Sequence, residues 1–519
     1  MTDPKEIAVG IDLGTTFSVV ARLDDLGRPQ TLINAEGDKV TPSVMLFEGN
    51  EVVVGKEAVK AMATDMAMIA ECPKRDLGHR MFHKDLGGRQ YPPEALEAWI
   101  LNKLRNDSTQ QIGQFEKVVI TVPAYFDEVR RKATQDAGYI AGFDVMDIIN
   151  EPTAAAVAFG FQQGFLTGES ADSDADKKTI LVYDLGGGTF DVTVMEIGGS
   201  DFKALATDGD VQLGGRDFDQ RLVDFVAEEF IRKYGADPRE DPNTEGLLWR
   251  EAEDAKRTLS ARSKATISCH YQGQAVRVEI TREGFHEMTQ DLLDRTSFTT
   301  RQTLQAAGLE WKQIDRVLLV GGSTRMPAVF DMLNNLSGKE PDRSVSPDEA
   351  VAHGAALHAG LLLAKYDGKS PNFSVKNVNS HSLGVVATDT KTRRKRNAIL
   401  IPRNTPLPVT AKRVFKTQKA AQKSILVQIV EGESASPDDC SQIGKCSVRD
   451  LPENLPAQTP IEVRFKYEEN GRLTVMVNVA DTDKKLQHEI TRENSMNQDQ
   501  LNSWRQYISG LGPAGNGSS

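Results

Sequence analysis

Two acidic residues flank a glycine-rich segment near the middle of the chain. Asp184 and Asp191 stand on either side of Leu185-Gly-Gly-Gly-Thr189, between a β-branched approach and an alternating return. This pattern predicts a β-hairpin over 180–194 whose tip uses the freedom of glycine to adopt positive φ angles. Glycines leave backbone N–H groups uncovered, and such a tip can surround an anion. The two carboxylates would repel a phosphate unless a cation lay between them, and Mg²⁺ meets that requirement.

The same pattern occurs once more near the N-terminus. Residues 6–20 form an aliphatic run that ends in Asp12-Leu-Gly14, followed by two threonines, Phe17 and a valine-rich return. One glycine-rich hairpin could be an ordinary turn, but two copies far apart indicate a duplicated domain with a phosphate-binding hairpin in each half. A nucleotide bound between the halves would contact both hairpins.

The composition is that of a globular protein without a broad polyanion-binding surface. The chain has 519 residues, enough for two to four domains, with 39% hydrophobic and 26% charged residues. Its net charge of −12 argues against nucleic acid or an anionic membrane as a partner. The four cysteines are scattered, so reduced thiols in a cytoplasmic compartment are expected. No signal peptide and no apolar run of membrane-spanning length is recognised.

Strands and helices alternate over the first 366 residues, as in an α/β domain. Strands are expected within 6–55, 117–122 and 145–149, and a third strand-to-glycine turn over 315–327. Helices are expected over 56–70, 93–106 (amphipathic), 127–141, 220–233, 249–262 and 346–364, with an alanine-rich helix beginning near Pro152. The segment 167–178 is expected to be an exposed loop.

Several charged residues lie where these elements begin or share a face. Lys74 and Arg75 follow a proline, where a solvated turn is the simplest interpretation. Glu151 opens a helix, either as a cap or facing a nucleotide at the strand ends. The turn within 315–327 leads into a helix whose N-terminus suits a phosphate or ribose. On the 249–262 helix one face, which would usually be solvated, carries Glu253, Lys256, Arg257 and Ser260.

The composition and the hydrophobic pattern of the sequence change beyond residue 366. Residues 367–382 are polar and are the best linker, and a second, all-β domain follows from 383 to about 491. Its expected strands include residues 385–386, 399–401, 414–415, 425–430, 461–465 and 473–477. Asn470-Gly471 predicts a hairpin turn, and the basic cluster at 393–396 a solvated hairpin tip. A short helix over 496–511, with Leu501, Trp504, Ile508 and Leu511 on one side, precedes a disordered tail.

Five motifs, taken in order, closely resemble those of the DnaK-type chaperones, the heat-shock proteins of seventy kilodaltons. They are IDLGTTFS (11–18), INEPTAAA (149–156), VYDLGGGTFD (182–191), VLLVGGSTRMP (317–327) and SPDEAVAHGAA (346–356). Their order separates the chain from actins and sugar kinases. The resemblance, over about residues 6–490, implies an actin-like (ribonuclease H-like) α/β ATPase domain at 1–366, with lobes of about 1–165 and 178–366, and a β-sandwich at 383–491 that holds extended apolar peptides. A short helix and tail remain at 492–519.

The resemblance also implies roles for single residues. Asp12 and Asp184 resemble carboxylates that hold Mg²⁺ through water. Lys74 would orient the attacking water or the γ-phosphate, because phosphoryl transfer depends on positioning and charge neutralisation. The hydrolytic site is matched by Lys74, Glu151, Thr189 and Asp191. Contacts to ATP or ADP are implied for Gly14, Thr15, Thr16, Phe17, Gly186, Gly187, Gly188, Thr189, Gly214, Gly215, Glu253, Lys256, Arg257, Ser260, Gly321, Gly322, Ser323, Arg325 and Asp348.

Peptide binding and coupling are assigned in the same way. The residues that align with the family's peptide cleft are Val385, Phe415, Ile425 and Val427. The alternation of Ile425, Val427 and Ile429 also places them on one face of a strand, where packing in the sandwich core is the alternative. Pro123 and Arg131 match residues that join the site to the domain surface, and they are candidates for coupling.

Departures from the family pattern leave two functions open. The chain is short between Arg80 and Tyr91, so a peripheral subdomain of the first lobe is trimmed. Asp147 replaces a usually basic residue on the face that receives J-domain co-chaperones, Arg216 replaces a usually acidic one, the linker is unusually polar, and most of the helical lid is missing.

The first hypothesis is a cytoplasmic ATP-dependent chaperone with slow hydrolysis, which binds unfolded segments and is served by a J-domain co-chaperone and a nucleotide exchange factor. The alternative is a divergent ATP-binding holdase or partner-binding module whose ATPase is weak or uncoupled. A filament-forming actin relative or a small-molecule kinase is disfavoured by the order of the motifs.

Overall fold

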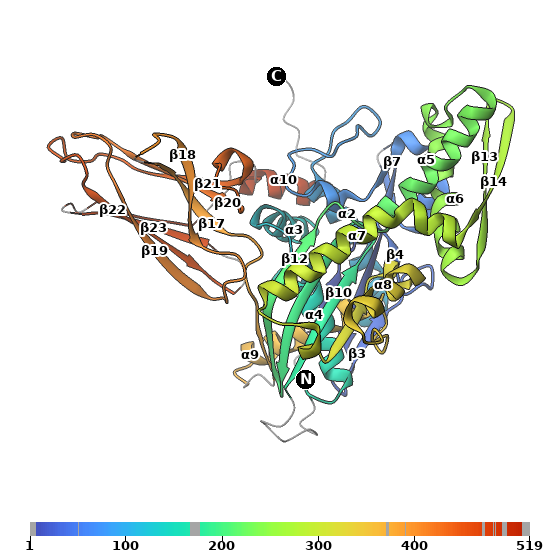
Figure 1. Ribbon diagram of the computed structural model, residues 1–519, viewed down its shortest axis with the longest axis horizontal. Helices are drawn as coiled ribbons and strands as arrows, with labels where there is room; N and C mark the ends of the chain where they lie inside the picture. Colours follow the sequence, from blue (N-terminus) through green and yellow to red (C-terminus); the bar gives the residue numbers. More distant parts are fainter. Residues whose placement is uncertain are drawn as a thin grey trace.

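The chain forms a large α/β body with a β-sandwich beside it (Figure 1). The computed structural model describes residues 7–49, 51–166, 177–369, 373–389, 391–469, 473–480, 482, 484–489 and 496–510. Four expectations fall outside the described residues: most of the loop at 167–178, the Asn470-Gly471 turn, Leu511 and the terminal tail.

The first lobe is built on a mixed sheet in the order β3-β2-β1-β8-β9. Strands β1 and β2 form the antiparallel hairpin predicted from the sequence, and β8 and β9 continue the sheet in parallel. The strands are β1 (Ala8–Asp12), β2 (Phe17–Leu23), β3 (Pro29–Leu32), β8 (Lys117–Val122) and β9 (Asp144–Asn150). Three further strands, β5 (Val44–Glu48), β6 (Glu51–Val54) and β7 (Ile69–Glu71), make a small separate sheet.

The second lobe repeats this arrangement in the order β15-β10-β11-β12-β16. Strands β10 and β11 form the central hairpin, and β15 lies parallel to β10 as β8 lies parallel to β1. The strands are β10 (Lys178–Leu185), β11 (Phe190–Gly198), β12 (Asp201–Asp210), β15 (Arg316–Val320) and β16 (Ser374–Lys376). The duplication predicted from two Asp-Leu-Gly motifs is therefore present as two sheets of like topology.

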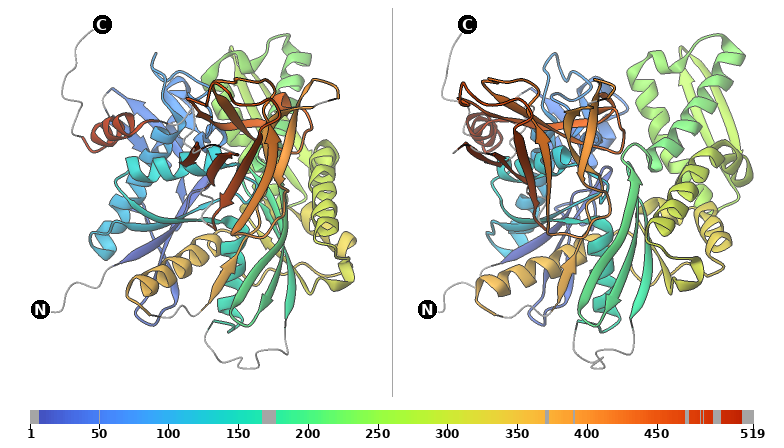
Figure 2. Two further views of the ribbon diagram at one scale, coloured as in Figure 1. Left: turned by 90° about the vertical axis from the view of Figure 1, so that its left-hand side faces the viewer. Right: turned by 60° about the vertical axis from the view of Figure 1, so that its left-hand side comes forward.

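Helices cover both sheets (Figures 1 and 2). They are α1 (Lys56–Ala61), α2 (Pro93–Ile112), α3 (Glu128–Ile140), α4 (Glu151–Gln162), α5 (Gly215–Tyr234), α6 (Pro242–Ala261), α7 (Arg282–Ala306), α8 (Pro327–Ser337) and α9 (Ala350–Tyr366). The helix expected over 56–70 was wrong beyond residue 61, because residues 69–71 pair as β7 with β5. Helix α2 is not amphipathic in its first turns, since residues 93–101 are buried on every side.

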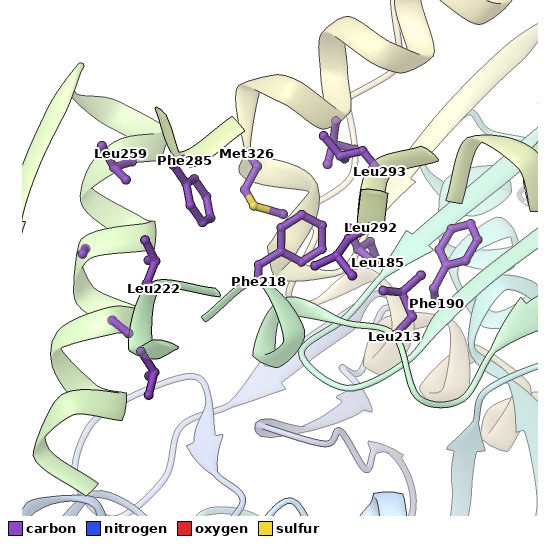
Figure 3. Packing of buried hydrophobic residues seen from close by; sticks show 14 of the residues in the cluster. Leu185, Phe190, Leu213, Phe218, Leu222, Leu259, Phe285, Leu292, Leu293 and Met326 are labelled. Atoms are coloured by element: carbon purple, nitrogen blue, oxygen red, sulfur yellow. The ribbon is translucent and has the colours of Figure 1, made fainter. Parts of the chain in front are cut away.

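The core of the second lobe shows why α5 to α8 are long and apolar on one side. Phe218 of α5 and Phe285 of α7 meet Met326 and Leu292 between the helices, in the same cluster as the hairpin residue Phe190, which lies to one side (Figure 3). Burying a side chain of this size contributes about 1.5–3 kcal/mol relative to exposure. This packing fixes the position of the second hairpin against α5 and α6.

The β domain is a sandwich of two antiparallel sheets, in the orders β18-β17-β20-β21 and β19-β22-β23-β24. Its strands are β17 (Leu383–Thr388), β18 (Lys395–Ile401), β19 (Val409–Lys416), β20 (Ile425–Glu431), β21 (Ser441–Val448), β22 (Pro460–Tyr467), β23 (Leu473–Val479) and β24 (Lys485–Glu489). The sequence analysis missed β21 and β24, whose residues are largely polar. The tip at 393–396 is exposed, as predicted.

The polar linker is not simply a connecting loop. Strand β16 pairs in parallel with β12, so the linker is an edge strand of the second lobe's sheet. Buried and half-buried polar contacts, two of them between side chains, then hold the sandwich against the α/β body. The hydroxyl of Tyr467 donates a hydrogen bond of 2.7 Å to Glu128, and Arg403 pairs with Asp208 at 2.6 Å.

The last helix, α10 (Gln498–Ile508), returns to the first lobe (Figure 1). Leu501 is buried there, and Trp504 packs against Trp99 with ring centroids 6.3 Å apart. The Arg89 guanidinium lies 5.0 Å from the ring centroids of both Tyr91 and Tyr507. The helix therefore covers an aromatic surface beside the shortened segment 80–91.

Candidate functional site

A cavity lies between the two hairpin tips. It has a volume of about 490 Å³ and is walled by residues from both lobes. The residues named from the sequence that line it are Asp12, Gly14, Thr15, Thr16, Phe17, Lys74, Glu151, Asp184, Gly186, Gly187, Thr189, Glu253, Lys256, Arg257, Ser260, Gly321, Gly322, Ser323, Arg325 and Asp348. Its other lining residues include Arg216 and Asp219, and its volume suits a nucleotide-sized ligand.

The glycines of the hairpin tips are needed for close approach rather than for backbone freedom. A Cβ atom on Gly187 would lie 2.3 Å from the Thr16 hydroxyl oxygen, and one on Gly188 would lie 2.2 Å from the Thr15 methyl carbon. Neither residue has a positive φ angle, nor does Gly14 or Gly186, so the expectation of positive φ was wrong. The two tips touch because the glycines have no side chains.

Lys74 is buried at the meeting point of the lobes. Its ammonium group donates hydrogen bonds of 2.6 Å to the Leu13 carbonyl oxygen and to a carboxylate oxygen of Glu151. Burial alone would lower the pKa of Lys74, but the neighbouring Glu151 and Asp12 outweigh burial and raise it. The lysine therefore stays charged, with a position fixed by strand and helix ends rather than by the solvated turn considered above.

The carboxylates around Lys74 lie near one another and are buried or half-buried. Burial, followed by the charge of Glu151, raises the pKa of Asp12 to about 7 and that of Asp191 to about 8, and it raises the pKa of Asp184 well above its usual range. Such a cluster favours a divalent cation, which would restore the charged forms.

The donor set fits Mg²⁺ held mainly by water and ligand oxygens. Within the described residues, no three His, Cys, Asp or Glu side chains are grouped as a direct metal site. Mg²⁺ commonly takes one or two carboxylates and keeps several waters. Asp12 and Asp184 line the cavity and have the chemistry for that role.

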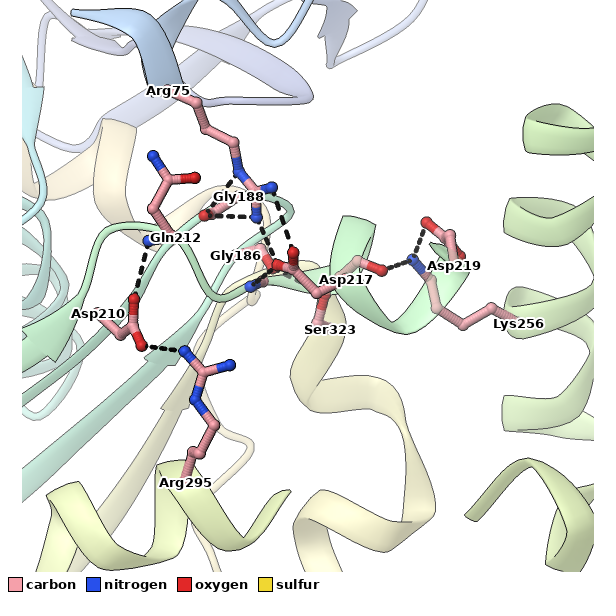
Figure 4. A network of polar contacts seen from close by, with 12 residues as sticks. Arg75, Gly186, Gly188, Asp210, Gln212, Asp217, Asp219, Lys256, Arg295 and Ser323 are labelled. Carbon is pink, nitrogen blue, oxygen red and sulfur yellow. Dashed lines mark hydrogen bonds and ion pairs between the residues drawn. The ribbon is translucent and has the colours of Figure 1, made fainter. Parts of the chain in front are cut away.

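Polar contacts connect the hairpin tip to both lobes (Figure 4). Arg75 donates to the Gly188 carbonyl at 3.0 Å and to Asp217 at 2.5 Å. Lys256 donates to the Gly215 carbonyl at 2.9 Å and to Asp219 at 2.7 Å. The Ser323 hydroxyl donates to the Gly186 carbonyl at 2.8 Å, so three elements hold the second tip in place.

The outer part of the cavity is lined by ion pairs. Arg257 and Glu253 of α6 are 2.6 Å apart, and Arg325 forms a bidentate pair with Asp348, with both distances 2.7 Å. The face of α6 predicted from spacing thus lines the cavity, instead of being only solvated. Guanidinium planes and a glycine turn at a helix entrance suit an adenosine group.

Arg216 lines this end of the cavity. Its guanidinium lies 3.6 Å from the ring centroid of Trp249 and pairs with Glu71 of the first lobe. Arg216 therefore links the two lobes across the cavity entrance. The charge of Arg216 was recognised as unusual from the sequence, but Arg216 was not predicted to be a site residue.

Four site predictions lie just behind the cavity wall. The backbones of Gly188, Gly214 and Gly215 pack together under the tip, and Gly215 N–H donates to the Gly186 carbonyl at 2.9 Å. Asp191 is buried, and accepts a hydrogen bond of 2.9 Å from the Tyr125 N–H. Glu97, which was not predicted as a site residue, is also buried. Burial raises its pKa, and the charge of Lys74 opposes that rise.

The coupling candidates lie between the cavity and the linker. Arg131 donates to the Asn150 side chain at 2.7 Å and to the Ala124 carbonyl at 3.1 Å, in the loop that begins at Pro123. The next carbonyl, that of Tyr125, is 2.9 Å from Nε2 of the linker residue His381. These contacts form a continuous path from β9 to the linker.

The residues aligned with a peptide cleft lie in the sandwich. Val385, Ile425 and Val427 are buried in its core, and Phe415 is half-buried against it. Asp147, on the face expected to receive J-domain partners, pairs with His358 of α9 at 2.8 Å. A hydrogen bond between these two side chains therefore occupies that position.

A cavity between duplicated sheets with paired phosphate-type hairpins, followed by a β-sandwich, defines an actin-like ATPase joined to a peptide-binding type of domain. The family model described as "Hsp70 protein" matches residues 8–507. The chain is similar to the Chaperone protein DnaK of Thermotoga petrophila, with 36% identity over 96% of this chain and 83% of the relative. It is also similar to that of Thermus thermophilus, with 38% identity over 95% of this chain and 82% of the relative.

The chain belongs to the Hsp70 family. Members of this family are ATPases that bind ATP or ADP with Mg²⁺. Within the described residues, no helix has the length and apolar character needed to cross a membrane.

Proposed function

We propose that this protein is a cytoplasmic molecular chaperone in which slow ATP hydrolysis between the lobes regulates the affinity of the β-sandwich for extended segments of unfolded proteins. One observation carries the proposal above all. Lys74 and both hairpin tips converge on a single cavity, while the linker strand β16 belongs to the same sheet as the second hairpin. A change in that sheet therefore reaches the segment that holds the sandwich.

Different residues would have different roles in ATP hydrolysis. The backbone N–H groups of the tips and Lys74 would supply positive charge to the phosphates. Glu151, which lines the cavity, would orient a water molecule, with Asp191 behind the cavity wall acting beside it. When bound, Mg²⁺ at Asp12 and Asp184 would neutralise phosphate charge. Arg257 and Arg325 lie at the adenosine end.

The positive charge of Lys74 should be essential for ATP hydrolysis. Replacing Lys74→Ala should lower kcat for ATP hydrolysis by about 10²-fold or more, because one preorganised electrostatic contact at a phosphate is lost. ATP affinity should change little, since the remaining tip contacts persist. Single-turnover hydrolysis and calorimetric titration with Mg-ATP measure the two effects. The exposed Lys60→Ala variant is the control, and full turnover by the Lys74 variant would contradict the role.

The alternative is a holdase whose ATPase is not coupled to peptide binding. Asp147 favours it, because a carboxylate hydrogen-bonded to His358 stands at the position where a basic residue was expected to receive a J-domain partner. If a J-domain co-chaperone and an exchange factor serve this protein, we propose that they use other contacts.

Peptide release rates separate the two functions. Coupling predicts that a fluorescent apolar peptide dissociates at least about tenfold faster with ATP than with ADP, which corresponds to about 1.4 kcal/mol of coupling. Because α10 packs on the first lobe, nothing among the described residues covers the sandwich as a lid, so release should be fast with both nucleotides. Stopped-flow displacement measures both rates. Equal rates would establish the holdase.

A further inference from the structure

The β-sandwich carries a concentration of positive charge that ATP hydrolysis does not use. Residues 389–424 contain eleven lysines and arginines and a single acidic residue, Asp389, in a chain whose net charge is −12. The segment spans the β17–β18 turn, strands β18 and β19, and the β19–β20 loop. Charge of one sign gathered in this way raises the local concentration of ligands of the opposite sign.

The two loops of this segment lie together. Gln418 of the β19–β20 loop donates a hydrogen bond of 2.9 Å to Thr388, where the β17–β18 turn begins. Arg413 reaches from β19 to β18 and donates to the Ile399 carbonyl at 3.2 Å. The exposed cations of both loops and of the end of β19 therefore lie near one another. We call this group the basic rim, formed by Lys391, Arg393, Arg394, Lys416, Lys419 and Lys423.

The cations of the basic rim have no acidic partners in the described part of the chain. Neighbouring cations do: Arg396 pairs with Asp389 and Lys412 with Glu462. Cations on an exposed edge strand also discourage association of sheets, which would explain charges along β18. Protection of an edge strand does not explain the charges in the β17–β18 turn and the β19–β20 loop.

Two apolar side chains of the strands are exposed, on the outer faces of the two different sheets. Val414 of β19 and Leu426 of β20 are each 57% exposed, while Phe415, Ile425 and Val427 beside them pack toward the core. The single aromatic residue of 389–424, Phe415, packs against the sandwich core. A surface for nucleic acid would be expected to offer aromatic side chains for base stacking, and this one does not.

We propose that the basic rim selects extended polypeptide segments in which acidic residues flank apolar ones. The rim attracts the carboxylates, while the sandwich holds the apolar centre as in the proposed function. This proposal rests on the proposed function, because it names the class of peptide that the sandwich takes.

The test compares two labelled peptides of equal length with the same apolar centre, one flanked by aspartates and the other by lysines. In fluorescence polarisation with the full chain, the acidic peptide should bind about tenfold more tightly at about 50 mM salt, and the preference should fade towards about 500 mM. The double variant Arg394→Gln with Lys419→Gln should lose most of the preference. The matched control, Lys312→Gln with Lys466→Gln, removes the same charge outside the rim and should keep it.

Each outcome has a distinct meaning. If both peptides bind equally well, the selectivity is overturned while peptide binding by the sandwich stands. If neither binds, the peptide-binding part of the proposed function fails as well. If a single-stranded RNA or a phosphatidylserine vesicle binds the rim more tightly than the acidic peptide, the rim serves a different polyanion and the proposal is wrong.

Discussion

Glu97 is a single side chain whose burial has a measurable effect. It lies in the first-lobe core on α2, both of its carboxylate oxygens lack hydrogen bonds within the described structure, and Lys74 is the charge that acts on it. Burial raises its pKa from 4.5 to about 8, against the opposing effect of Lys74. The folded protein thus keeps a proton that the unfolded chain releases above its ordinary pKa.

The stability of the protein should therefore depend on pH through Glu97. Between about pH 4.5 and 8 the folded state binds the extra proton, so this residue lowers the free energy of unfolding as pH rises, by up to about 1.4 kcal/mol per pH unit. The Glu97→Gln variant should be little changed at pH 5 and more stable than the parent by a few kcal/mol at pH 8. Urea unfolding at both pH values measures the difference.

The exposed Glu116→Gln variant is the control for that experiment, and it should shift both curves equally. An unchanged difference between pH 5 and pH 8 for Glu97→Gln would show that Glu97 is already ionised in the folded protein. The sequence offered no sign of this residue, because a glutamate within a helix is ordinarily exposed.

At the scale of elements, most of the site followed from local pattern and most of its surroundings did not. The hairpins, the helix face with Lys256 and the glycine turn at 321–322 were all recognisable, because motif and periodicity act over a few residues. Lys74 would have been read as a solvated turn from local sequence alone. Its burial depends on α2 and on Glu151, which lie far away in the chain, and the linker strand β16 likewise needs its partner β12 to form.

Helix α10 gives a prediction at this scale. Replacing Trp504→Ala removes ring contacts with Tyr91 and Trp99, whose centroids lie 6.1 and 6.3 Å away. Loss of this packing should lower the melting temperature of the α/β body by about 2–5 °C. Differential scanning calorimetry measures the shift. Phe298→Ala, at a position 62% exposed, should leave the transition in place, and an equal shift in both variants would argue against a specific role for the helix.

At the scale of the whole molecule, the docking of the sandwich depends on few contacts. Tyr467 is buried between the two bodies, and its hydroxyl is a donor to Glu128, whose own carboxyl group is buried. The Tyr467→Phe variant removes that donor and should weaken docking by about 1–3 kcal/mol. Small-angle scattering should show a larger radius of gyration, and hydrogen exchange of β16 should be faster.

Ile461→Leu, a core change at the other end of β22, is the matched control for Tyr467→Phe, since it preserves volume and removes no polar contact. It should leave the scattering profile unaltered. Scattering curves for Tyr467→Phe that superimpose on the parent's would mean that the remaining contacts, among them the Arg403–Asp208 pair and the Glu128 N–H bond to Glu431, are enough to hold the sandwich.

The return of the final helix to the first lobe changes how the molecule divides into parts. The polypeptide crosses from one body to the other twice, so the sandwich is an insert within a discontinuous unit rather than an appendage at its end. A fragment cut after residue 366 would display bare aromatic rings that the intact chain keeps covered. The solubility and enzyme kinetics of such a fragment would then differ from those of the intact chain. Adding residues 496–510 would be needed to cover the aromatic surface again.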